Sequence, residues 1–137
     1  MLAKLLLVAA LAATTPVQAQ TWTWINPAGG NFSVAANWDL KSAPASSGDT
    51  MLMFDLSASY SVTNDLVSGL TLSQLTFSDS SGAVNVSGTN FSFSVSSSFT
   101  GPEYDNFGSN SVTIANSVNI MDNDTMNWRH RAIPGLV

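Results

Sequence analysis

The chain contains no cysteine and few charged residues. Of its 137 residues, 9% are Asp, Glu, Lys or Arg, and the formal net charge is −5. Disulfide bridges, thiol catalysis and lipid attachment to a cysteine are therefore excluded. After Lys4 the basic side chains are Lys41, Arg129 and Arg131. Because so few cations neutralise few phosphates, nucleic acid and anionic membrane surfaces are not expected partners.

Long apolar runs are also missing. The most apolar stretch, Leu5–Ala13, is far shorter than the roughly 20 residues that span a bilayer. It follows one positive charge in Met1–Lys4 and precedes the small-x-small site Val17–Ala19. This order is typical of a secretory signal peptide. We therefore predict residues 1–19 as a cleaved signal peptide, a mature chain beginning at Gln20, and a secreted or cell-surface location.

The rest of the chain alternates Ser, Thr and Asn with Val, Leu and Phe, which predicts strands with one side in a core and one in water. Turn residues separate these runs, and a phase change at Gln74 predicts a bend. No stretch after residue 19 has helical spacing, so we predict an all-β fold. The expected strands are 51–54, 60–63, 70–72, 75–77, 84–86, 91–95, 112–114 and 118–120.

Several apolar positions recur at an interval of 21 residues. A fixed period of this length is typical of an array in which each turn of chain stacks on the next. We therefore predict a parallel β-helix or solenoid fragment, with an antiparallel β-sandwich as the alternative. The predicted columns are Leu70–Phe91–Val112 and Leu72–Phe93–Ile114, with further steps from Val86 to Phe107 and from Phe99 to Ile120.

The first mature segment carries a series of short motifs that resembles the start of bacterial proteins with autotransporter-associated β-strand repeats. The resemblance covers roughly residues 22–121 and implies a right-handed parallel β-helix that is exported and displayed at the surface. The motifs are Trp24, Gly30-Asn31-Phe32, Asn37-Trp38, Pro44, Asp49 and Met51–Phe54, followed by Leu75-Thr76-Phe77.

This pattern divides the chain into four parts. After the signal peptide we predict a Trp-containing N-terminal capping unit at 20–54 and a β-strand repeat region at 55–121. Residues 122–137 form an atypical tail that holds both arginines and the single histidine, His130. A frameshifted or truncated passenger and an ordinary, disordered terminal segment both account for such a tail. In the first case, strand repeats would resume in another reading frame of the neighbouring DNA.

The sequence offers little for catalysis or for a metal. Serine-type catalysis needs an adjacent base and a group that orients it, and a zinc site needs several His or Cys ligands. Glu103 and Asp105 would share one face of an extended segment, but a solvated turn accounts for them better than a glycosidase pair. Asp122–Thr125 lacks the Gly and Glu of a calcium loop. We predict no catalytic residue, metal or cofactor.

Trp22, Trp24 and Trp38 are the candidate binding residues. If their rings are exposed, they could stack on sugars. Alternatively, they cover the open end of the strand stack, which would otherwise expose unpaired backbone and favour aggregation. We predict a non-catalytic surface passenger segment of an autotransporter-like protein, in adhesion or matrix contact, with surface glycans or extracellular matrix as partners. The alternative is a secreted carbohydrate-binding β-sandwich that uses the Trp cluster; an enzyme ranks third.

Overall fold

A computed structural model describes residues 18–78, 82–94, 103–107, 110–120 and 127–130, and almost all of its regular structure is β-strand. A short 3-10 helix, η1 (Ala35–Asn37), accompanies the strands. The strands are β1 (Gln20–Trp24), β2 (Gly30–Asn31), β3 (Thr50–Phe54), β4 (Tyr60–Asn64), β5 (Leu70–Leu72), β6 (Gln74–Phe77), β7 (Val84–Gly88), β8 (Phe91–Phe93), β9 (Glu103–Asn106), β10 (Val112–Ile114), β11 (Val118–Ile120) and β12 (Asn127–His130).

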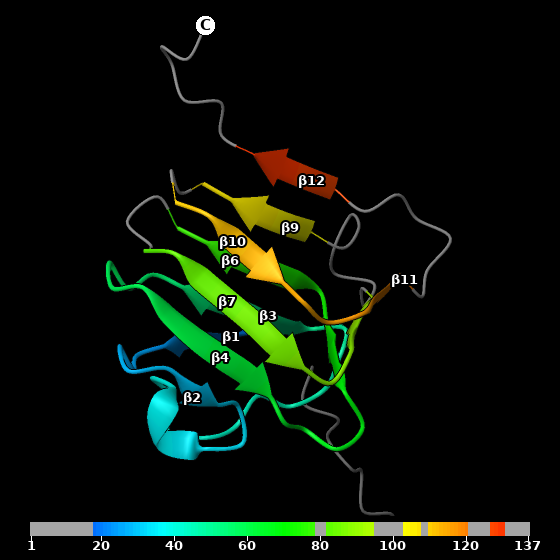
Figure 1. Cartoon of the computed structure of the whole chain (residues 1–137). Coiled ribbons are helices and arrows are strands. Elements are labelled where there is room, and N and C mark those ends of the chain that lie inside the picture. Colours follow the sequence, from blue (N-terminus) through cyan, green and yellow to red (C-terminus); the bar gives the residue numbers. More distant parts are fainter. Residues whose placement is uncertain (1–17, 79–81, 95–102, 108–109, 121–126, 131–137) are drawn as a thin grey trace, which may run out of the picture.

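The strands form three sheets (Figure 1). The first has the order β1-β3-β6-β9-β12, the second β10-β7-β4-β2, and the third β11-β8-β5. All pairings between these strands are parallel. The all-β prediction is therefore confirmed, and the alternative of an antiparallel sandwich is wrong.

From β4 onward the chain visits the three sheets in a repeated order. β4, β7 and β10 belong to the second sheet, β5, β8 and β11 to the third, and β6, β9 and β12 to the first. Each circuit thus adds one parallel strand to every sheet. In Figure 1 the strands are stacked from β1 and β2 at one end to β12 at the other. The bend predicted at Gln74 lies where the chain leaves the third sheet after Leu72 and enters the first.

The predicted columns are correct for one step only. Leu72 pairs with Phe93 as expected, but the third member is Ile120 and not Ile114, which pairs with Val86. The fixed interval fails because the circuit that contains β9 and its flanking loops is longer than the one before it. The step from Val86 to Phe107 is wrong for the same reason. The companion column is Leu70, Phe91 and Val118, and Phe99 lies outside the described residues.

Alternate side chains of these strands fill the space between the sheets. In β3, β4, β7 and β8 the first and third residues are buried and the second is more exposed. This pattern is expected for strands with one side in water. Parallel register places like side chains above one another, so that the rings of Phe54 and Phe77 stack at 5.1 Å. Complete burial of such a side chain contributes about 1.5–3 kcal/mol.

Two glycines allow close approach between neighbouring circuits. Gly29 has φ +78°, and a Cβ there would lie 2.1 Å from the carbonyl oxygen of Ser61. Gly88 has φ +104° and faces the carbonyl oxygen of Asn64 in the same way, at 2.2 Å. Any side chain would therefore meet backbone, in a conformation that L-residues rarely adopt.

Several predictions from the sequence concern residues that the structure does not describe. Residues 1–17 of the predicted signal peptide and Asp122–Thr125 lie outside the described residues, as does most of the predicted tail. Within that tail, Asn127–His130 forms β12, which pairs with β9. In the described ranges there is no helix of the length and apolarity that a membrane span requires.

Candidate functional site

The three candidate tryptophans lie inside the molecule. Trp22 and Trp24 are on β1, and Trp38 follows η1. Their exposed fractions are 4%, 0% and 0%, so no ring face is available to a sugar. The structure therefore argues against glycan stacking on these residues, because the hypothesis required exposed rings.

Aromatic contacts join Trp24 and Trp38 with neighbouring rings into one cluster. The rings of Trp24 and Trp38 meet edge to face at 5.0 Å, and Phe32 meets Trp38 in a similar way at 5.1 Å. On its other side Trp24 is stacked against Tyr60 at 6.4 Å. Such pairs add about 0.5–1.5 kcal/mol each beyond the area that they bury. The cluster joins the first strand of one sheet to the residues around η1.

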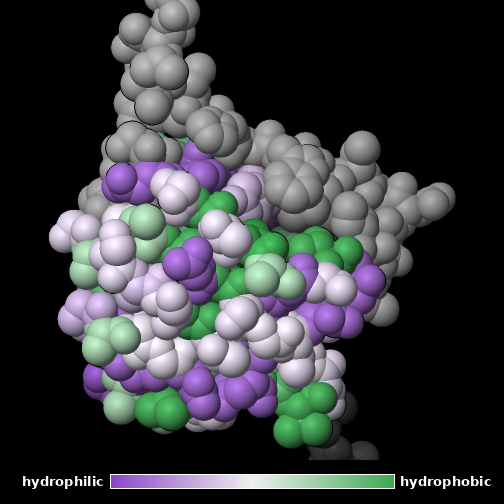
Figure 2. Space-filling model, in the orientation of Figure 1, coloured by the Kyte–Doolittle hydropathy of each residue, from purple (hydrophilic) through white to green (hydrophobic). Residues whose placement is uncertain are grey.

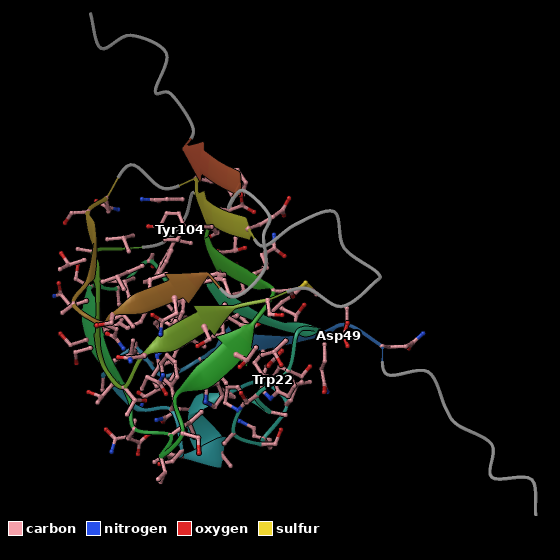
Figure 3. All side chains as sticks on the ribbon, turned by 90° about the vertical axis from the view of Figure 1, so that its right-hand side faces the viewer. Trp22, Asp49 and Tyr104 are labelled. Carbon is pink, nitrogen blue, oxygen red and sulfur yellow. The ribbon has the colours of Figure 1, made fainter. Side chains whose placement is uncertain are left out.

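The indole N–H of each of the three candidate tryptophans has an acceptor. The Trp24 indole donates to the carbonyl oxygen of Asn26 at 2.6 Å, and the Trp38 indole donates to that of Phe32 at 2.9 Å. The Trp22 indole donates to Ser42 Oγ at 3.2 Å. Figure 3 shows that Trp22 and Asp49 lie on the same side of the molecule. Burial therefore leaves no indole donor unsatisfied, as a stable core requires.

The residues after η1 seal the free edge of β1. The amide of Asp39 donates to the carbonyl oxygen of Thr23 at 3.0 Å, and the Asp39 carboxylate accepts from the Thr23 amide at 2.9 Å. The amide of Ile25 donates to the carbonyl oxygen of Asn37 at 2.9 Å. Trp24 and Trp38 form the one antiparallel bridge among the described residues. Segment 37–39 thus satisfies the edge groups of β1.

The outer strands of the other two sheets are covered in the same region. At β2, the side-chain amide of Asn37 donates to the carbonyl oxygen of Asn31 at 2.9 Å. At β5, the Thr71 amide donates to Ser46 Oγ at 2.8 Å, and its carbonyl oxygen accepts from the Ser47 amide at 3.0 Å. We call residues 32–49 the end seal. An exposed strand edge is a template for pairing with other chains, and the end seal covers three of them.

The carboxylates Glu103 and Asp105 lie on strand β9, so the solvated turn predicted for them from the sequence is wrong. The Gln74 amide donates to both, at 3.1 Å to Glu103 and 2.8 Å to Asp105. Asp105 is only 2% exposed, so a bulky substrate has no access to it. The pair therefore acts as a cross-strand polar contact. No group of three or more His, Cys, Asp or Glu side chains suited to a metal occurs within the described ranges; the side chain of His130 is not described.

A polar column at one corner was not predicted. Asn64 is fully buried, and its amide donates to the carbonyl oxygen of Thr89 at 3.1 Å. The Thr89 hydroxyl is 3.0 Å from two acceptors, the carbonyl oxygens of Asn64 and Leu66. Asn116, one circuit further, also donates to the carbonyl oxygen of Thr89. The backbone carbonyl oxygen of Asn90 also accepts from the Asn64 side chain, at 3.4 Å. The Asn90 side chain is exposed, so the interval of 26 residues among Asn64, Asn90 and Asn116 does not mark this column.

Burial and hydrogen bonds shift the pKa of three side chains. Burial and, secondarily, the negative Asp55 raise the pKa of Tyr60, and burial raises that of Tyr104. At Asp65, desolvation favours the neutral acid, but hydrogen bonds from the Ser33 hydroxyl and amide outweigh it and lower the pKa. These Ser33 bonds are 2.5 and 2.8 Å long. They connect the end seal to the loop after β4.

The described surface has a shallow hollow beside Val67, Ser68, Gly69, Thr89 and Asn90. It contains no ionisable side chain, and Val67 is almost completely exposed. Binding pockets usually combine an apolar enclosure with a few convergent polar groups, and this hollow lacks the apolar enclosure because Val67 is its one large apolar lining residue. Searches against protein-family models, curated proteins and solved structures found no match.

Proposed function

We propose that the chain is an exported, non-catalytic surface passenger segment that folds as a right-handed parallel β-helix. The observation that carries this proposal is the repeated path through three parallel sheets, since each circuit adds one rung to every sheet. Such stacking builds a rigid, extended scaffold. Segments of this kind present surfaces and do not enclose a small substrate.

The sequence pattern supplies the cellular part of the proposal. The three-part order at residues 1–19 supports export, and the Trp24 to Phe54 motif series supports an autotransporter-like passenger. A surface passenger contacts material outside the cell. Adhesion to surface glycans or extracellular matrix is therefore the role that we propose.

Polar, mostly neutral exterior positions support this role. On the strands the outward positions are chiefly Ser, Thr and Asn, as in the exposed Ser61, Asn85 and Thr113. A neutral exterior cannot depend on strong ionic attraction, so contact would rest on many hydrogen bonds. The buried state of Trp22, Trp24 and Trp38 leaves these polar faces as the available surface.

Export and adhesion can be tested in succession. The full chain is expressed in a bacterium, and the intact mass of the exported protein is measured; we expect it to begin at Gln20, and an Ala19→Arg variant should keep the leader. Beads coated with the exported chain should then adhere to immobilised matrix or glycan more than albumin-coated beads. Retention of residues 1–19 by the parent chain, or adhesion no better than albumin, would contradict the proposal.

A further inference from the structure

The outward strand positions of the second sheet carry hydroxyl and amide side chains, and we call this surface the polar face. On β4, Ser61 and Thr63 point outward between buried neighbours. On β7, Asn85 and Ser87 are exposed on either side of the buried Val86. Figure 2 views this side of the molecule, where pale and purple residues predominate. The polar face consists of Asn31, Ser61, Thr63, Asn85, Ser87 and Thr113.

Strand register aligns these side chains in two columns. One contains Ser61, Asn85 and Thr113, and the other Asn31, Thr63 and Ser87. Neighbouring rungs in a sheet lie about 4.8 Å apart, and the hydroxyls of Thr63 and Ser87 are 3.4 Å apart. The side chains therefore form a regular lattice of hydrogen-bonding groups.

The six strand positions of this lattice carry no ionisable side chain, and the carboxylate of Asp65 hydrogen-bonds to Asn31 at one edge of the face. Surfaces of soluble domains are commonly about 25–35% charged. All six members of the polar face are hydroxyl or amide residues. Charge complementarity therefore favours an uncharged partner and disfavours nucleic acid, anionic polysaccharide and anionic lipid.

Hydrogen-bonding capacity narrows the class of partner. Ser and Thr hydroxyls and Asn amides each donate and accept, as do the hydroxyls of a sugar. A flat lattice with a repeated spacing suits a ligand that repeats along its own length. We propose that the polar face binds a neutral polysaccharide chain laid across the strands. This inference rests on the proposed adhesive function and identifies the surface and the ligand class.

The test measures cosedimentation of the exported chain with an insoluble neutral glucan, and compares it with an anionic polysaccharide. We expect binding to the glucan with little dependence on salt, and binding about tenfold weaker in the variant Asn85→Ala combined with Thr113→Val. Asn119→Ala is the matched control, because Asn119 is an exposed asparagine on the third sheet. It should bind like the parent chain, and thermal melting should show all variants folded.

Each outcome separates the two proposals. No binding to the glucan, or equal binding by the double variant and the parent, overturns the polar-face inference. If bead adhesion persists in that case, the adhesive function stands and the ligand class is wrong. Loss of both bead adhesion and glucan binding in the folded parent overturns both. Self-association of the chain that disappears in the double variant would identify the face as a contact between copies instead.

Discussion

The two ends of the strand stack differ in how they are closed. At the end formed by β1, β2 and β5, side chains and backbone of the end seal hydrogen-bond to the outer strands. Trp24, Phe32 and Trp38 are completely buried there. At the other end, β10, β11 and β12 are the last strands of their sheets, Val118 is 38% exposed, and Val112 and Ile114 are only partly buried.

The difference shows that repetition and closure are separate problems. A parallel stack grows by repeating one pattern, but its first strands have no neighbour below them. The end seal solves this problem with residues that do not repeat, chiefly Asn37, Asp39 and the aromatic cluster. Stability should therefore be concentrated at the sealed end and decline toward β11.

The largest effect should come from Trp24→Ala. Removal of a completely buried indole costs about 3–5 kcal/mol, whereas Ile114→Ala at the other end should cost less because Ile114 is only partly buried. Urea unfolding followed by circular dichroism measures both. Equal losses at the two ends would contradict the comparison.

A smaller loss is expected for Asn37→Ala, which deletes an amide that contacts Asn31 and Asn26. Loss of these two part-buried hydrogen bonds costs about 0.5–1.5 kcal/mol each. The change also uncovers the β2 edge, so sedimentation velocity should show more self-association than in the parent. Asn119→Ala, which changes an exposed asparagine on the third sheet, serves as the control. A variant that remains as monodisperse as this control would show that Asn37 does not protect the edge.

Acid should weaken the link between the end seal and the loop after β4. The pKa of Asp65 is lowered in the folded chain, so its stabilisation is present above the unfolded carboxyl value, about 3.9, and is lost as pH falls through the folded value. Asp65→Asn should lower the melting temperature at neutral pH, and the gap from the parent should shrink in acid. A gap that is constant with pH would exclude this contribution.

The smallest effect at neutral pH is expected for Tyr60→Phe. The Tyr60 hydroxyl is buried and has no hydrogen-bond partner within the described structure, so its removal should change stability by less than about 1 kcal/mol. Because the folded pKa is raised, the stability tied to the neutral phenol is complete below the ordinary value of about 10 and is lost as pH rises above it. Melting curves at increasing pH should show the variant less sensitive to alkali. Equal alkaline sensitivity would contradict the role of Tyr60.

Alternation was enough to locate most of the strands. Tyr60–Asn64, Leu70–Leu72 and Phe91–Phe93 were predictable because one wet and one buried side force a period of two residues. The register beyond Phe93 was not predictable from a constant interval. Loop length changes between circuits without disturbing the strands, so Ile120 and not Ile114 reaches the third column.

The site was less predictable than the fold. Three tryptophans indicate either a binding surface or a cover over the end of the strand stack, and composition alone does not distinguish these two roles. The answer depends on burial, which depends on how Trp38 returns to Trp24 after a turn with no periodic signal. The seal at β5 likewise uses Ser46 and Ser47, which look in the sequence like any polar loop.

The most direct test of the stacked parallel arrangement is the strand register around Phe93, measured by NMR contacts between backbone protons of neighbouring strands. The account predicts parallel contacts of β8 with both β5 and β11, which pair Phe93 with Leu72 and with Ile120. Antiparallel contacts, or a pairing of Phe93 with Ile114, would contradict it.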